Sequence, residues 1–200
     1  MISGNRHCLR GAFLALVLLA GGAAAAADPP AWGVEQLMQG LSRAPSTKGK
    51  FVERKYLAML TAPLDSSGTL VYTAPGRLEK NTLTPKLERL VLDQDNLTLE
   101  YPDRGQRRVL ALQNYPVVWA FVESIRSTLA GDLQTLNRFY RASVAGSEEQ
   151  WRLSLKPVDG KMQSVVQEIR IEGRRDRVRT IEIIEMQGDR SVMTITEDSP

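Results

Sequence analysis

Apolar and polar residues alternate along short segments through most of this chain, and tight turns separate the segments. The clearest case is residues 151–156, where Trp151, Leu153 and Leu155 share one face of an extended strand. This alternation is typical of β-strands with one buried face. The turns are too short for the helical crossovers of a parallel sheet, so the pattern predicts an antiparallel one.

One helical stretch divides these segments into two groups. Apolar residues return at helical spacing over 117–129, and Pro116 suits the first turn of that helix. Short helices are also expected over 34–41 and after the capping residue Asp132, and Ser66-Ser67-Gly68 predicts a turn. The predicted strands are 47–57, 69–72, 77–84, 87–92, 97–101 and 107–112 before the helix, then an extended segment from Phe139, 151–156, 165–172, 178–186 and 191–197. This order favours one large curved antiparallel sheet, a barrel or half-barrel, with helices on one side.

The N-terminus has the three parts of a secretory signal peptide. Arg6 and Arg10 place positive charge before the apolar run 12–20, and the small residues 23–27 supply an A-x-A cleavage pattern. The apolar run is too short to span a bilayer, and no stretch of spanning length follows it. We therefore expect residues 1–27 to be cleaved, which leaves 28–200 as a single domain in the periplasm that does not span a membrane.

Cleavage would change the chemistry of the chain as well as its location. The sequence has one Cys and one His, and both, Cys8 and His7, lie in the expected signal peptide. The mature chain then has no thiol nucleophile, no Ser-His or Cys-His pair, no His-bearing zinc site and no disulfide. Loss of Arg6 and Arg10 also lowers the net charge from +3 to +1. Because acidic residues interleave one of the main arginine clusters, we expect no nucleic-acid binding.

Other catalytic and metal-binding patterns do not fit the sequence either. It contains no S-x-x-K or G-x-S-x-G string. Asp93 and Asp95 fit a hairpin turn better than a calcium loop, because Leu97 and Leu99 occupy positions that require oxygen ligands. We expect no enzyme activity, no catalytic residue, no metal site and no cofactor.

The helix at 117–129 has a wide apolar face that must cover part of the sheet. Ordinary core packing would make it a permanent plug of the barrel, whereas a removable lid would leave a ligand cavity beneath it. Helical spacing alone leaves both interpretations open.

Several strings, taken in order, resemble the outer-membrane lipoprotein carrier proteins of Gram-negative bacteria and their LolA-like relatives. They are Gly49–Lys55, residues 63–72, residues 75–80 followed by Pro85, residues 129–132 with Leu136 and Phe139, and residues 151–157. None of them is a catalytic signature. The resemblance rests on their order and spacing over nearly the whole mature chain.

The resemblance implies a mainly β (α+β) fold, an unclosed half-barrel of about 11 strands with a helical lid on its concave face. It also implies a monomeric carrier that holds the acyl chains of a lipid or lipoprotein between an inner-membrane donor and an outer-membrane acceptor protein. Each buried CH₂ gains roughly 0.8 kcal/mol, so an apolar cavity can hold an acyl chain without any chemistry.

One position departs from the family pattern. Ala74 stands where the core family has an arginine that latches the lid, which indicates a divergent branch. Arg77 is the nearby candidate for that latch. Some such branches are associated with acyl-chain or polyene lipid synthesis, and this context is an equal alternative to lipoprotein sorting.

The strand and helix faces supply the candidate binding residues. The lid is predicted to use Val118, Trp119, Val122 and Ile125. The cavity wall is predicted to consist of Phe51, Leu70, Tyr72, Leu78, Leu97, Leu99, Tyr101, Trp151, Leu153 and Leu155. A one-residue error in register would turn a strand's whole set away from the cavity.

A different function is compatible with the same fold. A protein-binding adaptor or envelope-stress sensor could use the half-barrel without carrying lipid. Such a protein would have a filled barrel and an exposed apolar patch, whereas a carrier requires a connected apolar cavity of several hundred Å³ under the helix.

Overall fold

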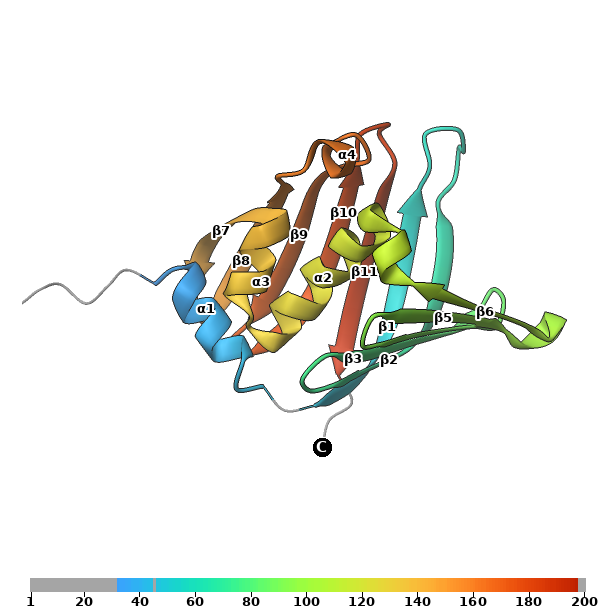
Figure 1. The fold of residues 1–200 in the computed structure, drawn as a ribbon, viewed down its shortest axis with the longest axis horizontal. Helices are drawn as coiled ribbons and strands as arrows, with labels where there is room; N and C mark the ends of the chain where they lie inside the picture. The colour runs from blue at the N-terminus through green and yellow to red at the C-terminus, as the bar shows by residue number, and fades with distance from the viewer. Residues whose placement is uncertain (1–31, 45, 198–200) are drawn as a thin grey trace, which may run out of the picture. The chain divides into compact units, whose positions relative to one another are not determined.

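The computed structural model describes residues 32–44 and 46–197, and the expected signal peptide lies outside these residues. Within them, 11 strands form one sheet in the order β6-β5-β4-β3-β2-β1-β11-β10-β9-β8-β7 (Figure 1). Every neighbouring pair is antiparallel. The edge strands β6 and β7 do not pair with each other, so the sheet is an unclosed half-barrel, and the predicted fold class is confirmed.

The elements follow the chain in two groups of strands separated by a helical insertion. The first group is β1 (Thr47–Tyr56), β2 (Leu64–Thr73), β3 (Arg77–Thr84), β4 (Glu88–Asp93), β5 (Asn96–Tyr101) and β6 (Gln106–Ala111). The second is β7 (Tyr140–Ser147), β8 (Gln150–Pro157), β9 (Val166–Arg174), β10 (Arg177–Glu185) and β11 (Arg190–Glu197). The helices are α1 (Val34–Leu41), α2 (Pro116–Ala130), α3 (Leu133–Phe139) and α4 (Gly160–Gln163), with 3-10 turns η1 (Pro102–Arg104) and η2 (Leu112–Asn114).

Local sequence explains where the long helix α2 begins and ends. Pro116 occupies its first turn, as expected for a residue that lacks an N–H donor. Gly131 ends it with a positive φ of 66°, a conformation that favours glycine. The Asp132 carboxylate then accepts a hydrogen bond of 2.9 Å from the backbone N–H of Thr135 and caps α3, as predicted.

The predicted turn at Ser66-Ser67-Gly68 is wrong, because these residues lie inside β2. The register between β2 and β3 shifts between Ser67 and Gly68. A Cβ atom at Gly68 would lie 1.9 Å from the backbone oxygen of Asn81, so this irregular pairing requires a glycine. Ser66-Ser67-Gly68 has the composition of a turn, but the glycine is needed here because the backbone of β3 approaches closely.

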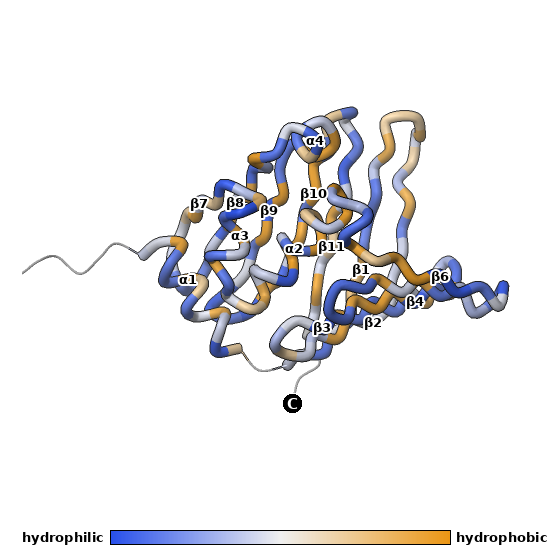
Figure 2. Tube along the Cα trace, viewed as in Figure 1, coloured by the Kyte–Doolittle hydropathy of each residue, from blue (hydrophilic) through white to orange (hydrophobic). Residues whose placement is uncertain are grey.

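The apolar faces of the strands and helices pack into two clusters within the described residues, in agreement with the alternation that Figure 2 shows along the strands. The larger cluster joins α1 and α3 to strands β7–β10 and includes Leu136, Trp151 and Leu153. The smaller cluster joins β4, β5 and η2 and includes Leu92 and Leu112. Residues of α2 pack against both clusters, so this helix bridges them across the helix-covered face of the sheet (Figure 1).

Candidate functional site: a cavity under the long helix

A cavity of about 740 Å³, called the main cavity below, lies between α2 and the sheet. Its helix wall consists of Val118, Phe121, Val122, Ile125 and Leu129. Its apolar floor includes Leu70, Tyr72, Leu78, Leu90, Leu92, Leu97, Val178, Ile181, Ile183, Met193 and Ile195. The volume is within the range of roughly 300–1,000 Å³ that is typical of ligand sites.

The way in which α2 is supported explains why this space is not filled. Phe121, Ile125 and Leu129 pack against the larger core cluster, whereas Val118 and Val122 pack against the smaller one. The helix therefore rests on packed side chains on both sides of the cavity. Collapse of α2 into the cavity would require these contacts to be broken.

The structure brings half of the predicted binding residues together. Leu70, Tyr72, Leu78 and Leu97 line the main cavity from the sheet, and Val118, Val122 and Ile125 line it from α2. These seven residues come from β2, β3, β5 and α2, and their part in ligand binding stays a prediction.

The prediction for β8 needs correction. Trp151, Leu153 and Leu155 are buried as expected, but they lie in the larger core cluster and not in the wall of the main cavity. The order of strands is the reason, because β8 lies next to the β7 edge of the sheet. Trp151 also donates a hydrogen bond of 2.8 Å from Nε1 to the backbone oxygen of Arg175.

Three other predicted wall residues and one lid residue also lie elsewhere. Phe51 is buried beneath the ammonium group of Lys80, which is 4.9 Å from the ring centroid. Tyr101 lines a second pocket, and Leu99 is half-buried outside the wall of the main cavity. Trp119 makes an edge-on contact with Phe139 at 5.7 Å between ring centroids, so it fixes α2 to α3 and does not line the main cavity.

The predicted wall omitted a group of charged residues at the boundary of the cavity. A second pocket, of about 850 Å³, adjoins the main cavity. Glu53, Lys55 and Lys80 line both spaces, and we call these three residues the polar junction. The available signal was the strand alternation, which places Glu53 on the same face as Phe51 and Lys80 on the same face as Leu78.

The carboxylate of Glu53 is the most buried part of the polar junction, with a side chain that is 6% exposed. Lys80 Nζ donates to its Oε2 at 2.5 Å, and Ser191 Oγ donates to its Oε1 at 2.7 Å. Burial opposes ionisation of this carboxyl, but the hydrogen bonds and the positive charges of Lys80 and Lys55 outweigh it, so the pKa of Glu53 is lowered. Glu53 is therefore ionised at neutral pH.

This lowered pKa predicts a pH dependence of stability. A carboxyl with a depressed pKa in the folded state contributes its full stabilisation above its unfolded pKa, near 4.5, and loses it as the pH falls through the lower folded value. We expect Glu53→Gln to be less stable than the parent at neutral pH, with a difference that narrows below pH 4.5. Thermal unfolding of both proteins over a range of pH measures this difference in stability. A difference that does not change with pH would contradict the lowered pKa of Glu53.

The sequence of the chain identifies its protein family. Residues 22–197 match the family described as outer membrane lipoprotein carrier protein LolA-like. The chain belongs to this LolA-like family. No curated protein sequence matches it.

Solved structures with a similar arrangement are distant in sequence from this LolA-like protein. A LolA superfamily protein from Nitrosomonas europaea has 10% identity and a TM-score of 0.43, over 85% of this chain and 96% of that one. A putative outer membrane lipoprotein-sorting protein domain from Vibrio parahaemolyticus has 9% identity and a TM-score of 0.42, over 83% and 91%. A chain in the complex of MucA and MucB from Pseudomonas aeruginosa has 14% identity and a TM-score of 0.47, over 83% and 57%. The family assignment rests on the sequence match.

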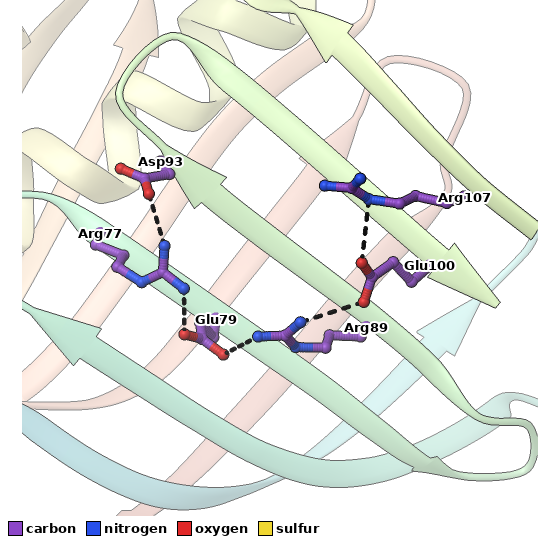
Figure 3. Close-up of polar contacts among 6 residues, drawn as sticks. All are labelled: Arg77, Glu79, Arg89, Asp93, Glu100 and Arg107. Atoms are coloured by element: carbon purple, nitrogen blue, oxygen red, sulfur yellow. Dashed lines mark hydrogen bonds and ion pairs between the residues drawn. The ribbon is translucent and has the colours of Figure 1, made fainter. Parts of the chain in front are cut away.

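Arg77, the candidate latch of this LolA-like protein, is occupied elsewhere. Figure 3 shows it in a ladder of ion pairs, where its guanidinium contacts Asp93 at 2.6 Å and Glu79 at 2.7 Å. The ladder continues through Arg89 and Glu100 to Arg107, across β3, β4, β5 and β6. Strand alternation turns Arg77 away from Leu78, which lines the main cavity. Arg77 therefore links β3 to β4 through these ion pairs.

A different arginine, Arg126, connects the helix to the sheet. It lies on α2 and donates from Nη1 to the backbone oxygen of Gln94, in the β4–β5 turn, at 2.8 Å. Its guanidinium also pairs with Glu123, one turn earlier on the same helix. A Cβ atom at Gly76 would lie 3.0 Å from Arg126 Cδ, so the glycine in the β2–β3 turn makes room for this side chain.

Residues 32–44 and 46–197 contain neither a membrane-spanning helix nor a cluster of metal ligands. None of the helices there is both long and apolar enough to cross a membrane. No group of three or more His, Cys, Asp or Glu side chains there is arranged to hold a metal ion.

Proposed function

We propose that this protein binds an acyl chain in the main cavity and carries a lipid or lipoprotein through the periplasm toward the outer membrane. The supporting observation is the apolar space of about 740 Å³ beneath α2, bounded by aliphatic side chains from helix and sheet. Membership of the LolA-like family favours a binding or carrier protein outside the cytoplasm. An inner-membrane donor and an outer-membrane acceptor protein are the partners that such a carrier requires.

The proposal is tested by asking whether the purified mature protein contains and exchanges lipid. Organic extracts of the protein are analysed by mass spectrometry, and a fluorescent fatty acid is displaced by unlabelled acyl lipids. We expect bound acyl species and saturable displacement. Empty extracts together with no saturable displacement would refute the carrier function.

The contact between Arg126 and Gln94 is proposed as the latch of the lid. It would replace the family's arginine at the position of Ala74, with the donor carried by α2 and the acceptor by the β4–β5 turn. A hydrogen bond from a charged donor contributes about 1.5–3 kcal/mol, which is sufficient to bias a lid between closed and open positions.

Replacement of Arg126 by Met is expected to open the lid more often. The variant loses both the Gln94 contact and the pair with Glu123, and we expect a bound fluorescent fatty acid to dissociate roughly tenfold faster. Stopped-flow displacement measures this rate, and hydrogen exchange of the α2 amides reports the opening. Arg138→Met, on the exposed face of α3, is the matched control, and equal rates in both variants would refute the latch.

A protein-binding adaptor is the second candidate function, and one observation favours it. The loop 57–63, between β1 and β2, carries Met59 and Leu60, whose exposed fractions are 86% and 43%. Exposed apolar residues at a loop tip fit a contact with another protein. Mass spectrometry separates the two functions, because an adaptor would yield extracts without bound lipid.

A further inference from the structure

The polar junction lies where an amphiphile in the main cavity would place its head. The main cavity is lined mostly by aliphatic side chains, and Glu53, Lys55 and Lys80 form part of its boundary with the second pocket. An acyl chain buried under α2 would leave its polar end at such a boundary, because burial of a polar or charged head in the apolar part is unfavourable.

The charges of the polar junction do not balance. One carboxylate, Glu53, faces the two ammonium groups of Lys55 and Lys80, at 3.7 Å and 2.5 Å. Other carboxylates also line the two spaces. Asp65 pairs with Arg54 at 2.9 Å and Glu79 pairs with Arg77 at 2.7 Å, whereas Asp189 accepts from the backbone N–H of Ala58 at 2.8 Å and keeps its charge. The three side chains of the polar junction together carry one net positive charge beside the apolar part of the main cavity.

The hydrogen-bond donors of the polar junction also favour an anionic ligand. The oxygens of Glu53 already accept from Lys80 and Ser191. The distance of 3.7 Å from Lys55 to Glu53 is longer than a hydrogen bond, so the ammonium donors of Lys55 are not used by that carboxylate. Lys55 is also 51% exposed, whereas Lys80 is 21% exposed and lies over the ring of Phe51. The donors of Lys55 are therefore available for a ligand, whereas both oxygens of Glu53 already accept hydrogen bonds.

We propose that the polar junction is a head-group site for an anionic amphiphile, an acyl or alkyl chain that ends in a carboxylate or phosphate monoester. This inference rests on the proposed function, since it assumes that the chain occupies the main cavity. Lys55 and Lys80 donate to the anionic head, and Glu53 positions Lys80. The positive charge selects against neutral lipids of the same chain length.

The test compares ligands that differ in their head and not in their chain. Oleate, oleyl phosphate and oleyl alcohol each compete with a neutral phenylnaphthylamine dye for the full mature protein. We expect at least one of the anions to displace the dye at roughly tenfold lower concentration than the alcohol. The stronger of the two anions identifies the head as a carboxylate or a phosphate.

Two variants locate the site that gives this preference. Lys55→Met is expected to reduce the advantage of the anion to threefold or less. Lys50→Met, which removes an exposed lysine from the opposite face of β1, is expected to leave the preference unchanged. The double variant Glu53→Leu/Lys80→Met, which removes the buried pair without leaving an unpaired charge, is expected to reduce the preference as well.

Each result has one consequence. Displacement by all three ligands at equal concentrations would overturn the head-group site and leave the carrier function intact. No displacement by any of them would contradict the carrier function itself. An anion preference that survives in both Lys55→Met and the double variant would overturn the assignment to the polar junction.

Discussion

Val122→Phe is expected to weaken acyl-chain binding at least about tenfold while the protein stays about as stable as the parent. Val122 lines the main cavity from α2, and a phenyl ring at this position would fill part of its 740 Å³. Filling an apolar cavity buries additional apolar surface, so the larger side chain adds stabilising contacts. We expect displacement of the fluorescent fatty acid to weaken at least about tenfold, with a change in the free energy of unfolding below about 1 kcal/mol.

The same substitution five residues earlier on the helix provides the control. Val117 packs against the larger core cluster and does not line the main cavity. Val117→Phe is expected to lower stability by about 1–3 kcal/mol through overpacking and to retain binding of the fatty acid. Equal loss of binding in both variants would show that a general disturbance of α2, and not a filled cavity, is responsible.

Lys80→Met is expected to destabilise the protein by about 3 kcal/mol, the lower end of the cost of breaking a buried ion pair. It removes the donor 2.5 Å from Glu53 and leaves a carboxylate that is 6% exposed without its main partner. Urea unfolding at neutral pH measures the loss. The folded variant should also take up a proton at higher pH than the parent, because burial then acts on Glu53 with less opposition.

The double variant Glu53→Leu/Lys80→Met tests the reason for that loss. Replacement of both charges by apolar groups of similar size is often neutral or stabilising, so we expect the double variant to recover most of the stability that Lys80→Met loses. If Lys80→Met were as stable as the parent, the ion pair would be screened by water. The buried description of Glu53 would then be wrong.

The strand order decided which predicted residues reach the cavity. The alternation in β8 correctly predicted that Trp151, Leu153 and Leu155 are buried, yet they pack in the larger core cluster, outside the wall of the main cavity. Leu70 and Leu78, predicted from the same kind of pattern, do line it. Alternation identifies an inward face, but it contains no information about which strand lies under which helix.

The polar contacts of the site depend on pairing between distant segments. Lys80 and Glu53 are 27 residues apart and lie on strands separated by β2, so their contact follows from the sheet register. Arg126, on α2, reaches Gln94 across 32 residues because the helix packs over the sheet, and strand register does not set this contact. Arg77 was a reasonable candidate for the latch because it lies near Ala74 in the sequence. In the structure its guanidinium forms ion pairs with Asp93 and Glu79 instead.

The sequence by itself determined that the chain forms an antiparallel sheet of about 11 strands interrupted by one long helix, since spacing, caps and turns act over a few residues. Only the tertiary structure decided that α2 bridges two core clusters, that an apolar cavity remains between them, and that Glu53, Lys55 and Lys80 meet at its boundary. These features depend on strand order and long-range packing. They appear only when segments far apart in the sequence become neighbours.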